Sequence, residues 1–439
     1  MGSAHRRVVS LLYLRCTSLL QANGTLGLIA TNTVAQGDTR EVGLDAMVAA
    51  GFTITRAIQS RSWPASSANL EYASVWGTIG PVADDVPRVS DDIEVGRIST
   101  LLEPAGRIEG VPAPLRENEG RSFIGCYALG MGFVLDPEEA QEWIAADARN
   151  AEVLFPYLNG EDLNTQPDSS ASRWVIDFND WGESRAATYT LPYQRICDRV
   201  KPERQRRKPD GSFALRKPLP ERWWQYAEKR PAMRKAIAEL SEVLVIARIS
   251  KTVMPLRIPT GSVMNEKIVV LTGPSYSDQA LLSSSLHLVW AVKYSSTLET
   301  RVNYSPSDVF LTFPRPKPTP ALEEIGRTLD QERREIMLRR QLGITKLYNL
   351  VNDPHVHSDA DVLRLRDIHV EIDLAVASGF GWDDIPLSHG FHVHRQMERW
   401  TVSPSARVEV LDRLLAENRR RAADQDGAVE AAATDSDAE

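Results

Sequence analysis

The segment 313–320 constrains the fold more than any other part of this chain, because every second residue in its sequence FPRPKPTP is proline. Proline fixes φ and lacks an N–H donor, so this segment cannot form a helix or a central strand. We therefore expect a domain boundary here. Beyond it the apolar periodicity is helical over 321–342, 359–378 and 403–421. The acidic, alanine-rich residues 422–439 are expected to be disordered.

The N-terminal part of the chain has an α/β pattern. The apolar runs 27–33, 52–58 and 70–76 predict strands. Residues 38–41 have the composition of a capping box, and the helix that they start should end near Gly51. One strand, one helix and two further strands make half of a doubly wound domain. We therefore expect a partial Rossmann-like sheet at this end.

The middle of the chain predicts a mixed α+β domain. Residues 80–120 are rich in Pro, Gly and acids, which indicates a linker or an irregular entry to the domain. Asp136, followed by Pro137 and two glutamates, is a strong helix start. The other expected elements are strands at 123–135, 174–178, 243–249 and 267–271 and a helix at 278–294. The expected fold class is thus α/β, then mixed α+β, then a small helical domain.

Composition excludes several classes of protein. Hydrophobic residues make up 42% of the chain and charged residues 25%, which is ordinary for a globular protein. No apolar run approaches the ~20 residues of a membrane span, and the N-terminal residues show no signal-peptide cleavage site. The cysteines, Cys16, Cys126 and Cys197, are too few and too far apart for a disulfide framework or a zinc ribbon. They indicate a reducing compartment, the cytoplasm.

The net charge of −8 conceals a strongly basic segment. Residues 422–439 hold six acids and no base, and without them the net charge is −2. Between Arg195 and Lys235, fourteen Lys and Arg stand against five Asp and Glu, a local charge of +9. The aromatic cluster 223–226 lies inside this segment, and cations interleaved with aromatics suit phosphate contact and base stacking. The alternative is a solvated helix face above two core tryptophans.

Ordered sequence blocks along nearly the whole chain carry a resemblance to one family. The blocks are TNT at 31–33 with Gln36, Gly37 and Arg40, LFPYLNGEDL at 154–163, RWWQYAEKRP at 222–231, VIARISK at 245–251, YSPSDVFLTFP at 304–314, LYNLVNDP at 347–354, and HVEIDLAV at 369–376 with Gly381 and Trp382. From about Leu11 to Leu415 the chain resembles the C-terminal part of the MmeI-like DNA methyltransferases. These enzymes belong to type IIL restriction–modification and related phage-defence systems.

The resemblance implies a domain layout and a function. Residues 1–82 would be the end of a methyltransferase domain that uses S-adenosylmethionine, 83–318 the target recognition domain, 319–421 a helical C-terminal domain, and 422–439 a disordered tail. The recognition domain would press on double-stranded DNA so that a catalytic domain can flip an adenine and methylate its N6 atom.

The sequence departs from the family where catalysis is concerned. The family's cofactor site needs a Gly-rich turn, and its adenine site needs an Asn-Pro-Pro-Tyr or Asn-Pro-Pro-Phe turn. This chain has no Pro-Pro pair, and the clustered glycines of 125–132 lack a strand–turn–helix context. We therefore expect the chain alone to be inactive and to need an upstream polypeptide that carries both motifs. Two alternatives remain: a separate specificity subunit that acts in trans, and a non-functional gene remnant.

A physical consequence concerns the expected strand 27–33. In the family's strand order it pairs with the strand that carries the missing Asn-Pro-Pro motif. Its edge should therefore be open and apolar, which favours aggregation or docking of the missing polypeptide.

The best candidates for base recognition are Glu299 and Arg301. In a strand, residues two apart project to one face. Arginine can then bond guanine bidentately, and glutamate can accept from cytosine. Arg248 and Lys251 are further candidates for base or phosphate contacts. The alternatives are an exposed ion pair for the first two residues and an ordinary edge strand for the others.

A cluster of cations is expected to hold DNA phosphates without sequence specificity. Its members are Arg204, Arg206, Arg207 and Lys208. Asn32 and Gln36 follow the carboxyl end of an expected strand, where ligand crevices lie in α/β sheets. They are weak candidates for an adenine or cofactor pocket, and turn capping is the favoured alternative.

The sequence supports neither a metal site nor a nuclease active site. The late histidines include His389, His392 and His394, a spacing that suggests zinc, but no cysteine accompanies them. We interpret them as turn and packing residues and expect no metal site. No Ser-His-Asp or Cys-His arrangement and no nuclease motif can be placed.

Overall fold

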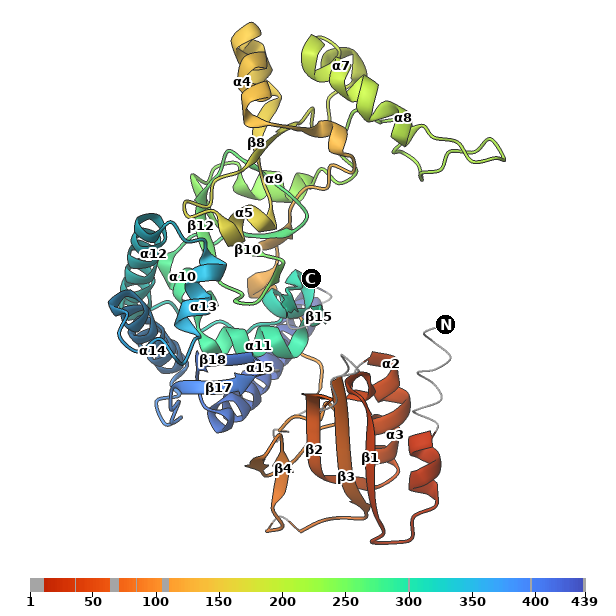
Figure 1. The fold of residues 1–439 in the computed structure, drawn as a ribbon, viewed down its shortest axis with the longest axis vertical. Helices are drawn as coiled ribbons and strands as arrows, with labels where there is room; N and C mark the ends of the chain where they lie inside the picture. Colours follow the sequence, from red (N-terminus) through yellow and green to blue (C-terminus); the bar gives the residue numbers. More distant parts are fainter. Residues whose placement is uncertain are drawn as a thin grey trace. The chain divides into compact units, whose positions relative to one another are not determined.

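The computed structural model describes residues 12–35, 37–63, 71–83, 85–104, 110–298, 301–394 and 397–436. The chain divides into two compact units, drawn in Figure 1. The first is Met1–Val111 with Leu411–Arg413, and the second is Pro112–Val410 with Leu414–Glu439. Within the described ranges, no helix combines the length and the apolar character that crossing a membrane requires.

The first unit is built on a five-stranded sheet of order β1-β3-β2-β4-β5. Neighbouring strands are antiparallel except for the parallel pair β2–β4. The strands are β1 (Thr25–Thr31), β2 (Phe52–Ser62), β3 (Glu71–Ile79), β4 (Arg88–Ser90) and β5 (Ile93–Val95). The helical segments are 12–18, η1 (Asn32–Ala35), α2 (Gly37–Arg40), η2 (Glu41–Asp45) and α3 (Ala46–Ala49).

The helices cover one face of this sheet. Leu26 and Leu28 alternate toward a core in which Leu44 and Met47 are fully buried, whereas Ile29 points to the other face and is 61% exposed. In the described sheet β1 is an edge strand whose neighbour is β3. The predicted strand, helix, strand and strand are thereby confirmed.

The first unit extends further along the chain than the sequence indicated. Strand β4 pairs with β2, and the buried Arg88 donates a hydrogen bond to the carbonyl of Val82 at 3.0 Å. Ser90 is also buried, and its hydroxyl donates to the carbonyl of Leu102 at 2.8 Å. These contacts attach 85–102 to the first sheet. The unit therefore runs to Val111, where the sequence suggested a boundary at residue 82 and a linker beyond it.

In the described part of the second unit the strands form four small sheets, ordered β12-β10-β14-β6, β13-β8-β9-β7, β11-β16-β15 and β17-β18. The strands are β6 (Ser122–Ile124), β7 (Val134–Leu135), β8 (Leu154–Leu158), β9 (Arg173–Ile176), β10 (Glu242–Ala247), β11 (Ile249–Ser250), β12 (Leu256–Pro259), β13 (Val263–Met264), β14 (Ile268–Leu271), β15 (Ser296–Leu298), β16 (Arg301–Asn303), β17 (Gly390–His394) and β18 (Met397–Thr401). Strands β9, β10 and β14 confirm three predictions. The strand expected over 123–135 is broken, because Leu129 and Gly130 both have positive φ.

Helices surround these sheets. They are η3 (Arg116–Asn118), η4 (Met131–Phe133), α4 (Pro137–Ala146), η5 (Ala148–Glu152), α5 (Gly160–Thr165), α6 (Glu183–Ala186), α7 (Thr190–Arg199), α8 (Lys201–Arg204), α9 (Pro231–Ile237), α10 (Tyr276–Ser283), α11 (Ser285–Tyr294), η6 (Pro306–Phe310), α12 (Pro320–Arg340), α13 (Ile344–Val351), α14 (Ala360–Phe380) and α15 (Pro404–Ser436). Helices α4, α12, α14 and α15 begin close to their predicted starts. The helix expected over 278–294 is two helices, because Ser284 leaves the helical conformation and caps α11.

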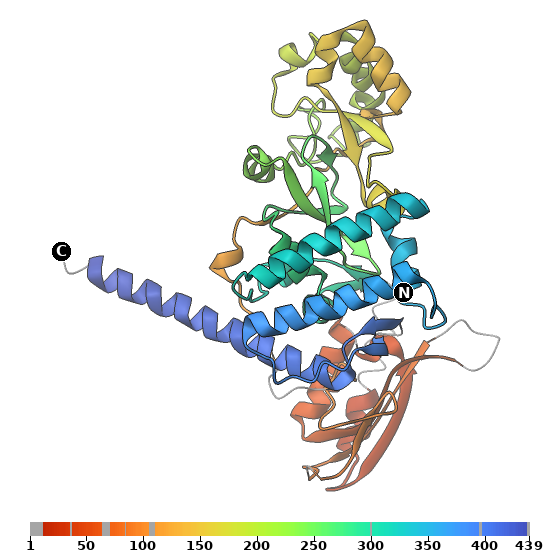
Figure 2. The same cartoon turned by 90° about the vertical axis from the view of Figure 1, so that its left-hand side faces the viewer.

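The helices that follow the proline segment pack on the domain before it. Helix α12 lies against α10 and α14, as Figure 2 shows for the two long helices. Gly326 makes the first contact possible, because a Cβ atom there would collide with the carbonyl of Tyr276. The helices therefore belong to the same compact unit as the preceding domain, and the expected separate domain 319–421 is not resolved as one.

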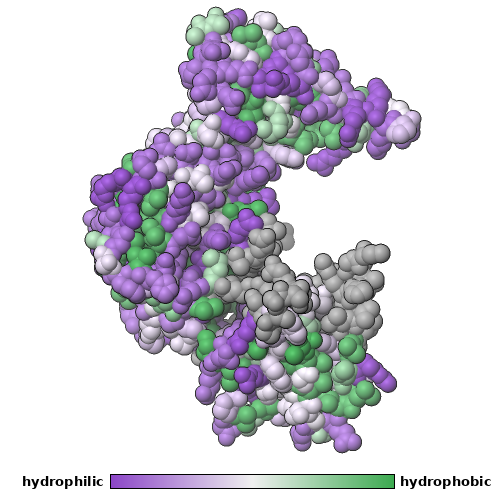
Figure 3. Space-filling model, viewed as in Figure 1, coloured by the Kyte–Doolittle hydropathy of each residue, from purple (hydrophilic) through white to green (hydrophobic). Residues whose placement is uncertain are grey.

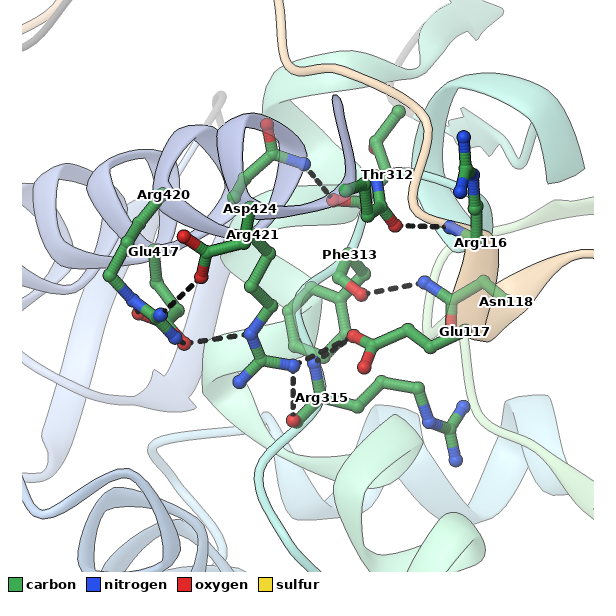
Figure 4. Close-up of polar contacts among 12 residues, drawn as sticks. Arg116, Glu117, Asn118, Thr312, Phe313, Arg315, Glu417, Arg420, Arg421 and Asp424 are labelled. Carbon is green, nitrogen blue, oxygen red and sulfur yellow. Dashed lines mark hydrogen bonds and ion pairs between the residues drawn. The ribbon is translucent and has the colours of Figure 1, made fainter. Parts of the chain in front are cut away.

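Helix α15 joins two segments that lie about two hundred residues apart in the sequence (Figure 4). The fully buried Asn418 accepts a hydrogen bond from the Ala113 N–H at 2.8 Å. Its amide nitrogen donates to the carbonyls of Ala113 at 2.8 Å and Thr312 at 2.6 Å. Farther along the helix, Gln425 accepts from the Arg116 N–H at 2.6 Å. We call these contacts the α15 clamp.

The residues expected to be a disordered tail are helical as far as Ser436. Alanine is the strongest helix former, and 422–433 contains several alanines that continue the helical stretch begun before it. The clamp contact of Gln425 lies in this part of α15.

Candidate nucleic-acid interface

Two predicted contact residues from distant segments meet at the sheet β11-β16-β15. Strands β11 and β16 are antiparallel, with Ser250 opposite Val302. Lys251 lies in a bend directly after β11, and Arg301 is the first residue of β16, so the pairing of Ser250 with Val302 brings both residues to the same end of the two strands. The structure therefore brings together two of the residues that sequence reasoning selected separately.

Side chains alternate between the faces of this sheet. Lys251 is exposed, and Arg301 and Asn303 are half-buried, on the outer face. Val302 and Tyr304 are buried on the inner face. We call Lys251, Arg301 and Asn303 the outer face of the small sheet.

A buried hydrogen-bonded pair supports the sheet from beneath. The Tyr304 hydroxyl lies 3.0 Å from Nε2 of His287, and Nδ1 of His287 lies 2.9 Å from the carbonyl of Leu282. Because a carbonyl only accepts, Nδ1 carries the proton and Nε2 accepts from the tyrosine. Burial lowers the pKa of His287 to about 4, so the imidazole is neutral near pH 7.

The outer face carries the groups needed to read bases in the major groove. Arginine and lysine donate to guanine, and asparagine both donates to and accepts from adenine. Asn303 was missed by the sequence analysis. The available signal was its position two residues after Arg301, which places both side chains on one face of a strand.

Arg248 lies at the inner end of the same sheet. Its carbonyl accepts from the Tyr304 N–H at 2.7 Å, and its own N–H donates to the carbonyl of Lys267 at 2.8 Å. The residue is half-buried, and its Nε has no hydrogen-bond partner in the described part of the chain. Arg248 thus joins two sheets through its backbone, and its use in DNA contact remains a proposal.

Glu299, the other half of the predicted Glu–Arg pair, lies outside the described residues. Strand β15 ends at Leu298, and strand β16 begins at Arg301.

The most basic part of the chain forms a hairpin-like arm after α8, residues 205–217, which projects from the second unit in Figure 1. The Ala214 N–H donates to the carbonyl of Arg206, and the Lys208 N–H donates to the carbonyl of Ser212, both at 2.8 Å. Gly211 completes the turn with a φ of +80°. These bonds give the arm a defined backbone.

The surface of the arm is rich in cations, and it is largely hydrophilic in Figure 3. The Arg207 guanidinium stacks 4.3 Å from the Phe213 ring and donates to the carbonyl of Gly211 at 2.7 Å. The exposed cations are Arg206, Arg207, Lys208, Arg216 and Lys217. Such a surface suits phosphate contact.

The assignment of Arg204 to the DNA contacts is corrected by its burial. Its side chain is 1% exposed and donates to the carbonyls of Gln225 at 2.6 Å, Leu129 at 3.0 Å and Ala128. Burial lowers its pKa to about 10. Because the side chain is buried and both terminal nitrogens donate to carbonyls inside the protein, Arg204 anchors the base of the arm and cannot reach a phosphate.

The aromatic cluster is also part of the core. Trp223, Trp224 and Tyr226 are 2%, 8% and 4% exposed. Trp224 donates to the carbonyl of Trp181 at 2.8 Å, and the Tyr226 hydroxyl donates to the carbonyl of Ile176 at 2.9 Å. The alternative of core tryptophans under a basic surface therefore holds, and base stacking by these rings is ruled out.

The remaining predictions concern the pocket candidates Asn32 and Gln36 and the late histidines. Asn32 begins η1 at the end of β1, and Gln36 lies outside the described residues. Across the described ranges, no group of three His, Cys, Asp or Glu could hold a metal ion. His389 instead lies 2.8 Å from the buried carboxylate of Asp373.

Comparison with known proteins finds a family match within the second unit. Residues 124–317 match the model of the MmeI target recognition domain. The fold is similar to that of MmeI, from a structure described as the type IIL restriction–modification enzyme in complex with DNA. That match has a TM-score of 0.62 and 16% identity and covers 95% of this chain. A second match, the type IIG restriction endonuclease BpuSI, has 11% identity and a TM-score of 0.33 and covers 84% of this chain and 49% of that one.

This chain spans only 52% of the MmeI chain. A search of curated proteins finds no match. The family match contains both the small sheet and the arm, and the fold match extends over nearly the whole chain. Residues 124–317 thus match the MmeI target recognition domain, and the fold around them is similar to that of MmeI.

Proposed function

We propose that this chain recognises a specific sequence in double-stranded DNA for an adenine-N6 DNA methyltransferase of a restriction–modification or phage-defence system. The observation that carries the proposal is the outer face of the small sheet. Lys251, Arg301 and Asn303 converge there from two segments, inside the domain that matches the MmeI recognition model.

Two surfaces would have different roles in DNA binding. The outer face of the small sheet presents arginine, lysine and asparagine, the side chains that read base edges. The arm 205–217 presents exposed cations on a defined backbone, which suits contacts with phosphates. Arg248 is a further candidate beside the first surface.

The methyl-transfer step needs a partner. S-adenosylmethionine and the target adenine would be bound by an upstream polypeptide, because the Gly-rich turn and the Asn-Pro-Pro motif are absent from this sequence. The first unit supports the proposal through β1, which in the described sheet pairs on one side only and so offers backbone groups for another strand. The same absence favours a second possibility, a specificity subunit that acts in trans with a complete catalytic subunit.

The first test is selection from a random duplex library by the full chain, followed by sequencing of the bound DNA. We expect one enriched sequence for the wild type. Arg301→Gln should relax or change the preferred base at one position and cost about 1–3 kcal/mol on the original sequence. Asn303→Asp should act on a neighbouring position.

Arg206→Gln is the matched control, because it removes a cation without touching the small sheet. It should weaken all sequences alike. Equal loss on every sequence with Arg301→Gln would contradict base reading, and a wild type without any enriched sequence would overturn recognition by this chain alone.

The arm predicts a specific salt dependence. Neutralising Arg206, Arg207 and Lys208 with glutamine should lower the slope of log K against log salt by about 1 for each phosphate that the arm no longer neutralises. The expected loss of affinity is the same for specific and random duplexes. Lys346→Gln, on the exposed side of α13, is the control that should leave the slope unchanged. An unchanged slope in the arm variant would exclude the arm from the interface.

Methyl transfer is tested with labelled S-adenosylmethionine and DNA. The chain alone should transfer no label, and transfer should appear when the upstream polypeptide is added. Transfer by this chain alone would refute the need for a partner.

A further inference from the structure

A cavity of about 620 Å³ lies in the second unit, beside the α15 clamp and away from both surfaces proposed for DNA. Cationic side chains dominate its lining: Arg121, Arg315, Lys317, Arg420 and Arg421 against Glu117 and Asp278. Figure 4 shows part of this wall, with Arg421 bonded to Glu117 and Arg420 beside Glu417 and Asp424. The lining carries a formal charge of +3.

Two of the arginines share one carboxylate. Arg121 donates to Oδ2 of Asp278 at 3.2 Å, and the Arg315 guanidinium contacts the other oxygen. The side chain of Arg315 is 10% exposed and that of Arg121 is 34% exposed. The Asp278 carboxylate thus faces two guanidinium groups, and an added anion would be stabilised beside them.

Prolines restrict the backbone that carries two of these cations. Arg315 and Lys317 alternate with prolines of the 313–320 segment, and Pro316 and Pro318 also line the cavity. Proline limits the backbone, so little conformational freedom is lost when a ligand binds. Gly273 leaves room for the Arg121–Asp278 pair, because a Cβ atom there would collide with both side chains.

The remaining cations approach from α15. Arg421 donates to Glu117 and to the carbonyl of Arg315, both at 2.7 Å. Arg420 is paired with Glu417 and Asp424 on its own helix, and its side chain is 60% exposed at the rim. Burial is the main cause that lowers the pKa of Arg315 to about 9; the neighbouring Arg121 also lowers this pKa, and Glu117 opposes the shift.

We infer that this cavity is a phosphate-binding site, with Arg121, Arg315 and Lys317 as the groups that hold the anion. Guanidinium groups recognise phosphate through paired N–H donors, and the ammonium of Lys317 adds a point charge at the mouth. Two sources share this chemistry: a phosphodiester of DNA outside the recognised sequence, and a small phosphorylated molecule.

The test uses the full chain and inorganic phosphate, titrated by calorimetry at constant ionic strength with chloride as the reference anion. We expect saturable binding at millimolar concentrations or below. Arg121→Gln and Lys317→Gln should each weaken it about tenfold, which corresponds to about 1.4 kcal/mol. Lys317 is exposed, so its variant should fold normally. Arg206→Gln, in the arm, is the control that should bind phosphate as the wild type does.

The two sources separate in a second measurement. If DNA supplies the phosphate, a saturating duplex should abolish phosphate binding, and Lys317→Gln should lower the salt slope of DNA binding by about 1. If a small molecule supplies it, phosphate should bind the DNA complex unchanged and the slope should stay constant. Absence of saturable binding, or equal binding by Arg121→Gln, Lys317→Gln and the wild type, would overturn the inference. This outcome is independent of sequence selection, so it can fail while the proposed function stands.

Discussion

At the scale of single residues, two buried histidines make the stability of the second unit depend on pH. Burial lowers the pKa of both His287 and His369 to about 4 from an ordinary 6.5. The unfolded chain therefore binds more protons than the folded chain between these values. Stability should be complete above about pH 7 and fall as the pH decreases toward 4, by up to about 3 kcal/mol per histidine. Urea unfolding of the second unit at a series of pH values measures this.

His287→Asn should remove about half of that pH dependence, whatever it does to stability at pH 7. The exposed His357→Asn serves as the control and should leave the dependence intact. A full pH dependence in the His287 variant would show that this imidazole is not the titrating group.

Some individual residues could not be assigned correctly from the sequence. Arg204 and Arg206 look equivalent in the printed chain, but Arg204 turns inward to three carbonyls while Arg206 is exposed. Composition records the charge of a segment and not the direction of each side chain. Asn303 was overlooked although its spacing of two residues from Arg301 is visible in the sequence, because its place beside the predicted contact residue Lys251 depends on the pairing with β11, some fifty residues earlier.

At the scale of elements, the α15 clamp should stabilise the second unit. Asn418→Ala removes three hydrogen bonds and leaves backbone groups of the half-buried Ala113 and the buried Thr312 without this partner. Each buried group left unsatisfied costs about 1–3 kcal/mol, so the free energy of unfolding should fall by ~3 kcal/mol. Arg420→Ala, two residues along the same helix, breaks only exposed ion pairs and should cost about 0–1 kcal/mol.

Chemical denaturation with separate probes in the two units provides the measurement. The transition of the second unit should shift with Asn418→Ala, and that of the first should not. A loss as small as that of Arg420→Ala would contradict a stabilising role for the clamp.

Elements with a strong local signal were predictable. Helix α4 starts at Asp136 and Pro137, and α12 starts just after the prolines, because caps and periodicity lie within a few residues of each other. The candidate site was less predictable. Strands β11 and β15 are only two and three residues long, and they form only because they pair with residues that are distant in the sequence. The sequence placed the end of the first domain at residue 82, before β4 and β5, because these two strands are also short and give little local signal.

At the scale of the whole molecule, the net charge and the extent of the match to MmeI can be interpreted only when the parts of the chain are considered separately. The net charge of −8 sums an acidic C-terminal segment and the basic segment 195–235, so it did not argue against DNA. The fold of MmeI extends over 95% of this chain, whereas this chain spans 52% of MmeI. The part in common includes residues 124–317, which match the MmeI recognition model, and the described sheet of the first unit ends at β1.

That open strand yields a prediction for the isolated chain. Strand β1 has a neighbour on one side in the described sheet, and Ile29 on its uncovered face is 61% exposed. An unpaired apolar edge favours pairing with a second chain. The isolated protein should therefore self-associate, or bind its upstream polypeptide, in sedimentation or light-scattering measurements. Ile29→Lys should shift it toward monomer without lowering its thermal stability. Val393→Lys makes the same change at a residue 60% exposed in the second unit and should leave association as it was. A monodisperse wild-type monomer would contradict the role of this edge, and association that Val393→Lys disrupts as strongly would place the contact elsewhere.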